Sequence, residues 1–188
     1  MRPLAALLAR VIVEPRWDIL IYTVPSQPSR KRAAVWRELK KVGAVYLRDG
    51  VAVLPAGSGT IEALRRIVAL VEGFAGQATV VATADFDASR SAALRAQIAT
   101  ERAAEYAEVV REAEGLLAHL RREAAHRAFT RAERAALERD LGKLTRWAAQ
   151  IRARDYLAAA EPRALTEVLA RCGRALHALP DTGNAPAT

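Results

Sequence analysis

The sequence predicts an α+β protein in which a ferredoxin-like βαββαβ domain is followed by an antiparallel α-helical hairpin and a further C-terminal helix. Strand-type and helix-type patterns alternate in the order β-α-β-β-α-β within about seventy residues. Two long helical stripes with a short connection then follow, which indicates an antiparallel pair. At 188 residues, the chain has room for one or two small domains. We expect an N-terminal extension, a ferredoxin-like domain, a helical domain and a disordered tail, at residues 1–16, 17–85, 86–179 and 180–188.

The first half of the ferredoxin-like domain begins at Trp17 with a β-forming run that ends at Pro25. A helix is expected over residues 29–42, because one face is apolar and the basic residues fall on the other. The apolar face of that helix is expected to consist of Val35, Trp36, Leu39 and Val42.

The second half of this domain begins with a β-hairpin. Asp49-Gly50 lies between two alternating apolar runs, at 44–48 and 51–54, which favours a type I′ turn. A helix over about 61–71 and a strand over 78–83 complete the order. Both helices would cover one face of the sheet, so the other face needs a cover. The helix that follows or a second chain could supply it, and we predict a homodimer.

The helical domain is expected to begin with one long helix, capped by Asp87 and running to about Ala125. Thr130 and Glu133 form a capping box, which restarts the chain as a helix at residue 131. Counting outward from the connection near Ala128 places acids of the first helix opposite bases of the second. The expected pairs are Glu101 with Arg154, Glu105 with Arg152, Glu108 with Arg146, and Glu112 with Lys143. The single cysteine, Cys172, lies in an apolar helical stretch and is expected to be a packing residue.

Composition excludes several classes of protein. Hydrophobic residues make up 52% of the chain, which excludes global disorder. No apolar run approaches the roughly 18 residues of a spanning helix, so we expect no membrane partner. One cysteine allows neither an internal disulfide nor a cysteine-based zinc site, and a cytoplasmic setting fits best.

Positive charge is concentrated in residues 30–48, although the whole chain carries a net charge of only +8. Seven bases meet one acid in this segment (7 − 1 = +6), whereas 17 bases meet 15 acids from Asp85 onward (17 − 15 = +2). Such a cluster indicates an anionic partner, most often nucleic acid, or else an ordinary solvated helix face. The candidate DNA-phosphate contacts are Arg30, Lys31, Arg32, Arg37, Lys40 and Lys41.

Other polar motifs carry weaker signals. Ser26, Ser29 and Arg30 lie where a strand leads into a helix, so they could bind an oxyanion. Ordinary capping by Ser26 or Ser29 is the favoured interpretation, because Pro28 removes one of the available N–H donors. The Gly57-Ser58-Gly59-Thr60 loop lacks the spacing and the lysine of a phosphate loop. Asp85 and Asp87 could hold a magnesium ion, but capping is the simpler role for Asp87. His119, Glu123 and His126 share a helix face without a second motif to complete a di-metal site. We expect no metal, cofactor or catalytic set.

Two segments resemble the N-terminal domain of the chromate-resistance protein ChrB family. The first is Trp17-Asp18-Ile19-Leu20-Ile21-Tyr22-Thr23-Val24-Pro25-Ser26, and the second is the basic helix with Val35-Trp36-Arg37 and Gly43-Ala44. Similar residues continue through the Leu47-to-Pro55 hairpin and the Ile151-to-Tyr156 stretch. The resemblance implies a bacterial cytoplasmic protein linked to chromate-responsive gene control. The sheet topology also resembles the middle domain of PaaX-type repressors.

Three functions remain open at this point. The resemblance favours a regulator that contacts DNA phosphates through the basic helix, with no enzymatic activity. The ferredoxin-like part is also similar to the small CRISPR-associated endonuclease, but Thr23-Val24-Pro25-Ser26 replaces the aspartate that such nucleases keep after their first strand. A non-enzymatic interaction scaffold and a protein that binds chromate or sulfate are the alternatives.

Overall fold

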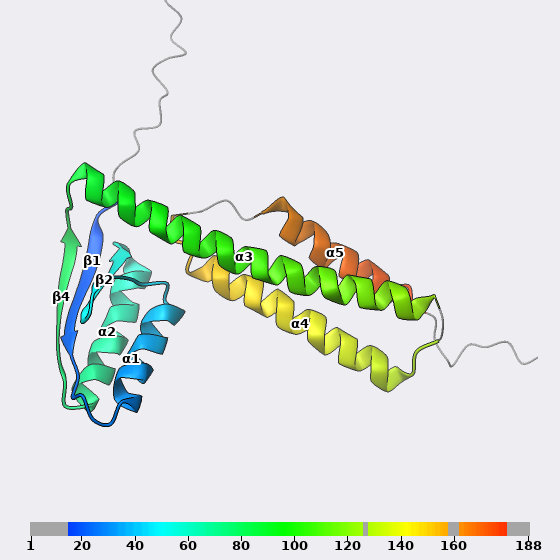
Figure 1. Cartoon of the computed structure of the whole chain (residues 1–188), viewed down its shortest axis with the longest axis horizontal. Helices are drawn as coiled ribbons and strands as arrows, with labels where there is room; N and C mark the ends of the chain where they lie inside the picture. The colour runs from blue at the N-terminus through cyan, green and yellow to red at the C-terminus, as the bar shows by residue number, and fades with distance from the viewer. Residues whose placement is uncertain (1–14, 126–127, 158–161, 180–188) are drawn as a thin grey trace, which may run out of the picture. The chain divides into compact units, whose positions relative to one another are not determined.

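The computed structural model describes residues 15–125, 128–157 and 162–179 (Figure 1). Most of the expected N-terminal extension and the whole expected tail lie outside these ranges. The chain divides into two compact units, one up to Gln97 and the other from Ile98 onward. The expected α+β class is confirmed, because a four-stranded antiparallel sheet with its helices is followed by further helices.

The first unit contains the βαββαβ order that the sequence predicts. Its elements are β1 Trp17–Thr23, α1 Arg30–Lys41, β2 Val45–Arg48, β3 Val51–Pro55, α2 Ser58–Gly73 and β4 Gln77–Ala84, followed by the first turns of α3 Ala88–Ala124. The strands lie in the order β2-β3-β1-β4, and all neighbours are antiparallel. Helices α1 and α2 lie on one side of this sheet (Figure 1). This is the split βαβ arrangement of ferredoxin-like folds.

Buried Asp18 joins three parts of the first unit. Its Oδ2 accepts a hydrogen bond from the Thr60 hydroxyl at 3.0 Å, and its Oδ1 accepts one from the Thr83 backbone N–H at 3.0 Å. The backbone N–H of Gly57 is 3.4 Å from Oδ2. A buried carboxylate is stable when its oxygens are hydrogen-bonded in this way. The strand β1 is thereby connected to the start of α2 and to the end of β4.

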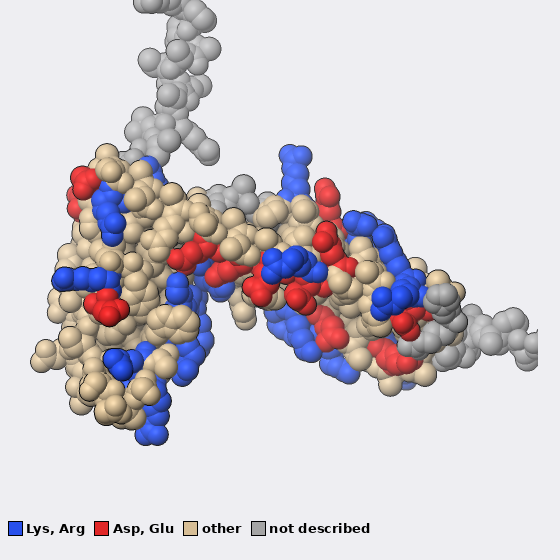
Figure 2. Space-filling model, viewed as in Figure 1, with Lys and Arg blue, Asp and Glu red and all other residues tan. Residues whose placement is uncertain are grey.

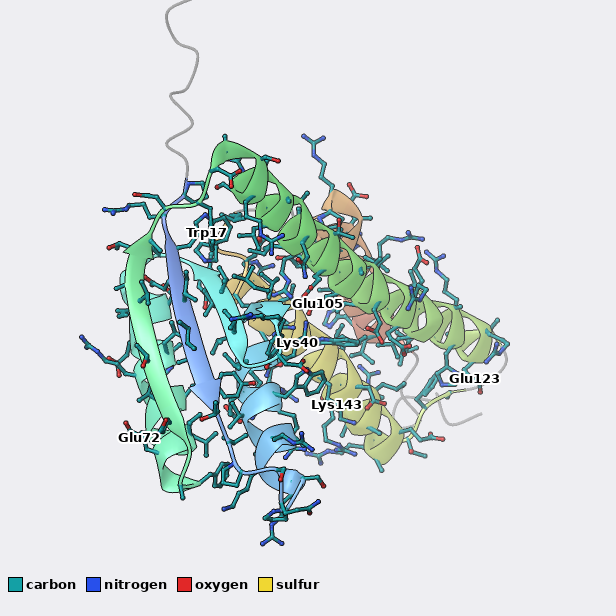
Figure 3. The ribbon with its side chains drawn as sticks, turned by 60° about the vertical axis from the view of Figure 1, so that its left-hand side comes forward. Trp17, Lys40, Glu72, Glu105, Glu123 and Lys143 are labelled. Carbon is teal, nitrogen blue, oxygen red and sulfur yellow. The ribbon has the colours of Figure 1, made fainter. Side chains whose placement is uncertain are left out.

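The sheet face opposite α1 and α2 is partly covered. At one end, the Trp17 indole N–H donates to the Ser91 hydroxyl at 3.2 Å, so the first turns of α3 lie over this part of the face. Figure 3 shows Trp17 beside the start of α3. Farther along, Ile21 and Val81 remain 46% and 41% exposed. The following helix therefore supplies part of the cover that we expected, and homodimer formation stays a prediction.

The β2–β3 hairpin is confirmed, but the expected type I′ turn is wrong. Only Gly50 of the two turn residues has a positive φ, at 73°. The register also shifts between Tyr46 and Arg48, so β2 carries one extra residue opposite β3. A bulge with one left-handed glycine satisfies the strand twist without a left-handed Asp49.

Helix α2 ends in a Schellman motif in which the glycine, Gly76, follows the left-handed residue instead of occupying that position. The backbone N–H of Ala75 donates to the Glu72 carbonyl at 2.8 Å, and that of Gly76 donates to the Val71 carbonyl at 3.0 Å. Ala75 occupies the left-handed position, with φ of 59°, where glycine is usual. A Cβ at Gly76 would overlap the Thr23 carbonyl oxygen and lie 2.9 Å from Val71 Cγ1.

Two neighbouring substitutions in this motif should have opposite effects on stability. Ala75→Gly should stabilise the protein by about 0.5–1 kcal/mol, since it removes left-handed strain at some cost in unfolded-state entropy. Gly76→Ala should destabilise it by about 3 kcal/mol, because the new methyl group has no space beside backbone atoms. Urea unfolding followed by circular dichroism measures both changes. Equal midpoints for the two variants would contradict this account of the motif.

The second unit consists of three helices: the remainder of α3, α4 Arg131–Ala153 and α5 Arg163–His177. The predicted capping box is confirmed, because the Thr130 hydroxyl accepts from the Glu133 N–H and the Glu133 carboxylate accepts from the Thr130 N–H. Cys172 is fully buried beside Ala113, Leu117 and Val168, so its packing role is confirmed. Within the described ranges, no helix is both long and apolar enough to cross a bilayer.

The register of α3 against α4 differs from the expected one at Arg154. Its Nη2 pairs with Glu105 at 3.0 Å, one helical turn from the expected Glu101. Glu101 lies 3.7 Å from Arg102 on its own helix. The partner expected for Arg154 was wrong because tight packing of apolar residues sets the register, whereas long arginine side chains can adjust by a turn. These apolar residues are Tyr106, Val109, Ala148 and Ile151.

Candidate nucleic-acid interface

Helix α1 buries a narrower face than the sequence predicted. Val35 and Leu39 are fully buried, but Trp36 is 51% exposed. The prediction that Trp36 belongs to the apolar face is therefore wrong. Arg32, Trp36 and Lys40 lie four residues apart and so share one side of the helix. An exposed tryptophan between basic residues is typical of surfaces that bind nucleic acids.

The six predicted phosphate contacts all lie on α1, but they are not equally available. The Lys31 ammonium donates to the Phe74 carbonyl at 3.1 Å and lies 5.8 Å from the centre of the Phe74 ring, so it joins α1 to the end of α2. Lys41 forms an ion pair with Glu38 at 2.6 Å. Lys40 is half-buried and has a partner of its own.

Three arginines of the predicted set can contact a ligand directly. Arg30, Arg32 and Arg37 are exposed, and their side chains make no hydrogen bond or ion pair with other described residues. Figure 2 shows basic side chains gathered over α1, whereas acidic and basic side chains alternate over α3 and α4. Helix α1 therefore carries three available positive charges within eight residues.

The predicted oxyanion residues lie at the entrance to the same helix. Ser26, Ser29 and Arg30 are all exposed. Ser29 occupies the N-cap position, but its side chain makes no capping hydrogen bond. Capping by Ser29, which the sequence favoured, is therefore not what the structure shows.

A cleft that sequence reasoning missed opens beside α1. It has a volume of about 410 Å³. The lining residues come from the end of β1, the exposed side of α1 and the β2–β3 hairpin: Tyr22, Thr23, Val24, Arg32, Trp36, Tyr46, Asp49 and Gly50. The sequence signal that could have indicated this cleft is the alternation of side chains along the strands, which places Tyr22 and Tyr46 on the helix-covered face of the sheet. Their convergence with Trp36 depends on tertiary packing.

Two tyrosine side chains contribute hydroxyl groups to the lining of the cleft. The hydroxyl oxygens of Tyr22 and Tyr46 are 3.2 Å apart and share a hydrogen bond. Burial raises the pKa of Tyr46 far above its usual range, and the Tyr22 hydroxyl and the nearby Asp49 charge raise it further. Tyr46 therefore remains a neutral hydrogen-bonding group. The Tyr22 backbone N–H donates to the Gly50 carbonyl at 2.7 Å, which fixes the hairpin against β1.

The other polar motifs have structural partners. Asp87 caps α3, since its Oδ1 accepts from the Arg90 N–H at 2.9 Å, and exposed Asp85 pairs with Arg16 at 3.3 Å. The Thr60 hydroxyl bonds Asp18 and the Gly57 carbonyl. His119 Nδ1 is 3.5 Å from Arg122. His126, which the sequence placed on the same face as His119, lies outside the described residues.

The chain is an α+β protein, with a ferredoxin-like sheet in its first unit and three helices in its second. Its basic helix α1, with an exposed tryptophan, is a candidate nucleic-acid interface. The chain belongs to the family of ChrB N-terminal regions, because the family model described as "Protein ChrB, N-terminal" matches residues 32–182.

One curated relative supports this membership. The protein ChrB of Cupriavidus metallidurans is 30% identical over 95 residues, which is 50% of this chain. The matched stretch spans only 29% of that relative. No solved structure matches the chain.

Proposed function

We propose that this chain acts in chromate-responsive gene regulation and contacts DNA phosphates through α1. Family membership supports the regulatory role. The observation that carries the DNA contact is the presence of Arg30, Arg32 and Arg37 on one helix, all exposed and without partners among the described residues. Arginine is well suited to this task, because its planar guanidinium matches the geometry of a phosphate. These contacts give affinity for duplex DNA and no base-specific recognition.

The salt dependence of DNA binding tests this proposal. A fluorescently labelled duplex of about 20 base pairs should bind at low salt, with affinity falling as each contact releases counterions. Three neutralised phosphates give a slope near −2.7, so affinity should drop about 40-fold between 50 and 200 mM salt. Fluorescence anisotropy measures both values. The absence of binding at 50 mM salt would reject the proposal and favour the scaffold hypothesis.

A further inference from the structure

The cleft beside α1 differs from a simple phosphate-binding surface. One wall is the Trp36 indole, which is half exposed. Tyr22 and Tyr46, whose hydroxyls share a hydrogen bond, line the same cavity. Arg32 provides a positive charge, and Asp49 provides a hydrogen-bond acceptor. A flat aromatic wall, a cation and polar groups of both kinds are therefore present in one cavity.

The size of the cleft limits the ligand. Its volume of about 410 Å³ lies within the range of about 300–1,000 Å³ that is typical of sites for organic ligands. A tetrahedral oxyanion would contact Arg32 and leave Trp36 without a partner. A nucleotide uses both groups, because its base can stack on the indole while its phosphate pairs with the guanidinium.

We propose that this cleft binds one unpaired nucleotide, with the base on Trp36 and the 5′-phosphate on Arg32. The base edge faces the two tyrosine hydroxyls and Asp49, which offer a donor and acceptors. This inference rests on the proposed function, since the phosphates adjoining the bound nucleotide would lie along α1. The nucleotide comes either from a single strand of nucleic acid or from the free pool.

Single-stranded probes with and without bases separate stacking from phosphate contact. The probes are a labelled 12-nucleotide oligothymidylate and an abasic strand of the same length. Trp36→Leu should weaken oligothymidylate binding about tenfold or more, because one stacked base is lost, and should leave abasic-strand binding unchanged. Trp36→Phe keeps an aromatic ring and should restore most of the affinity. Arg32→Gln should weaken the binding of both strands.

Two further measurements complete the test. Thymidine 5′-monophosphate should compete with the oligothymidylate if the free pool is the source, whereas the absence of competition points to the strand. Circular dichroism should show that Trp36→Leu unfolds at the wild-type midpoint, because this side chain is half exposed.

Equal oligothymidylate binding by wild type and Trp36→Leu overturns the inference, as does equal affinity of the wild type for the abasic strand and the oligothymidylate. If duplex DNA still binds with its expected salt slope in those cases, the proposed function stands. If no DNA of any kind binds, the proposed function fails as well.

Discussion

Reversing two exposed charges on α1 should reduce duplex affinity at least about tenfold at 50 mM salt. The variant Arg30→Glu/Arg37→Glu removes two of the three arginines of α1, none of which has a side-chain partner among the described residues, and leaves Arg32 in the cleft. The magnitude of the salt slope should fall by about two, because each lost phosphate contact removes about one. Both side chains are exposed, so unfolding free energy should change by less than about 0.5 kcal/mol.

A matched variant separates the position of the charge from its amount. Arg139→Glu/Arg163→Glu changes the net charge equally, on helices α4 and α5 of the other unit. The positions correspond, since Arg30 and Arg163 are each the first residue of a helix and Arg37 and Arg139 are interior. If the control lost as much affinity as the α1 variant, overall charge would explain the binding and α1 would be rejected as the contact surface.

Truncation of Trp17 to alanine should destabilise the first unit by about 3–5 kcal/mol, the range for large buried aromatic residues. Trp17 is fully buried, and its ring lies 6.3 Å from that of Phe86. The change removes this packing and the hydrogen bond that the indole donates to Ser91. A substitution this costly is comparable with the whole stability of a small domain.

Two milder variants divide the Trp17 effect into packing and hydrogen bonding. Trp17→Phe should lose less than the alanine variant, because a ring still fills most of the site. Ser91→Ala should cost about 1–3 kcal/mol by leaving the buried indole N–H unpaired. Urea unfolding followed by circular dichroism gives the three values. A Trp17→Ala midpoint equal to that of Ser91→Ala would show that packing around the ring contributes nothing.

Local sequence signals predicted the order of the elements well. The apolar periods, the capping box at Thr130 and the cap at Asp87 each depend on residues close in the chain, so they can be found without tertiary information. The hairpin at Asp49-Gly50 was predicted for the same reason, but its turn type was not. A bulge is selected by how β2 pairs with β3, and composition does not encode that choice.

The candidate site was predicted only in part. The charge of α1 is visible in the sequence, but Trp36 looked apolar and therefore buried. Its exposure follows from the small contact area of a 12-residue helix on the sheet, where Val35 and Leu39 already fill the interface. Tyr22 and Tyr46 lie 24 residues apart, and only the sheet brings them to one cleft. Long-range pairing of this kind leaves no local pattern to recognise.

The environment of Cys172 has a consequence for redox chemistry. Its thiol donates to the Ala113 carbonyl at 3.2 Å, and burial raises its pKa. Oxidation of cysteine proceeds through an accessible thiolate, and this sulfur is neither ionised nor accessible. Chromate is a strong oxidant of thiols. As the only cysteine of the chain, this shielded residue would let the protein meet such an oxyanion repeatedly without covalent damage to its helical core.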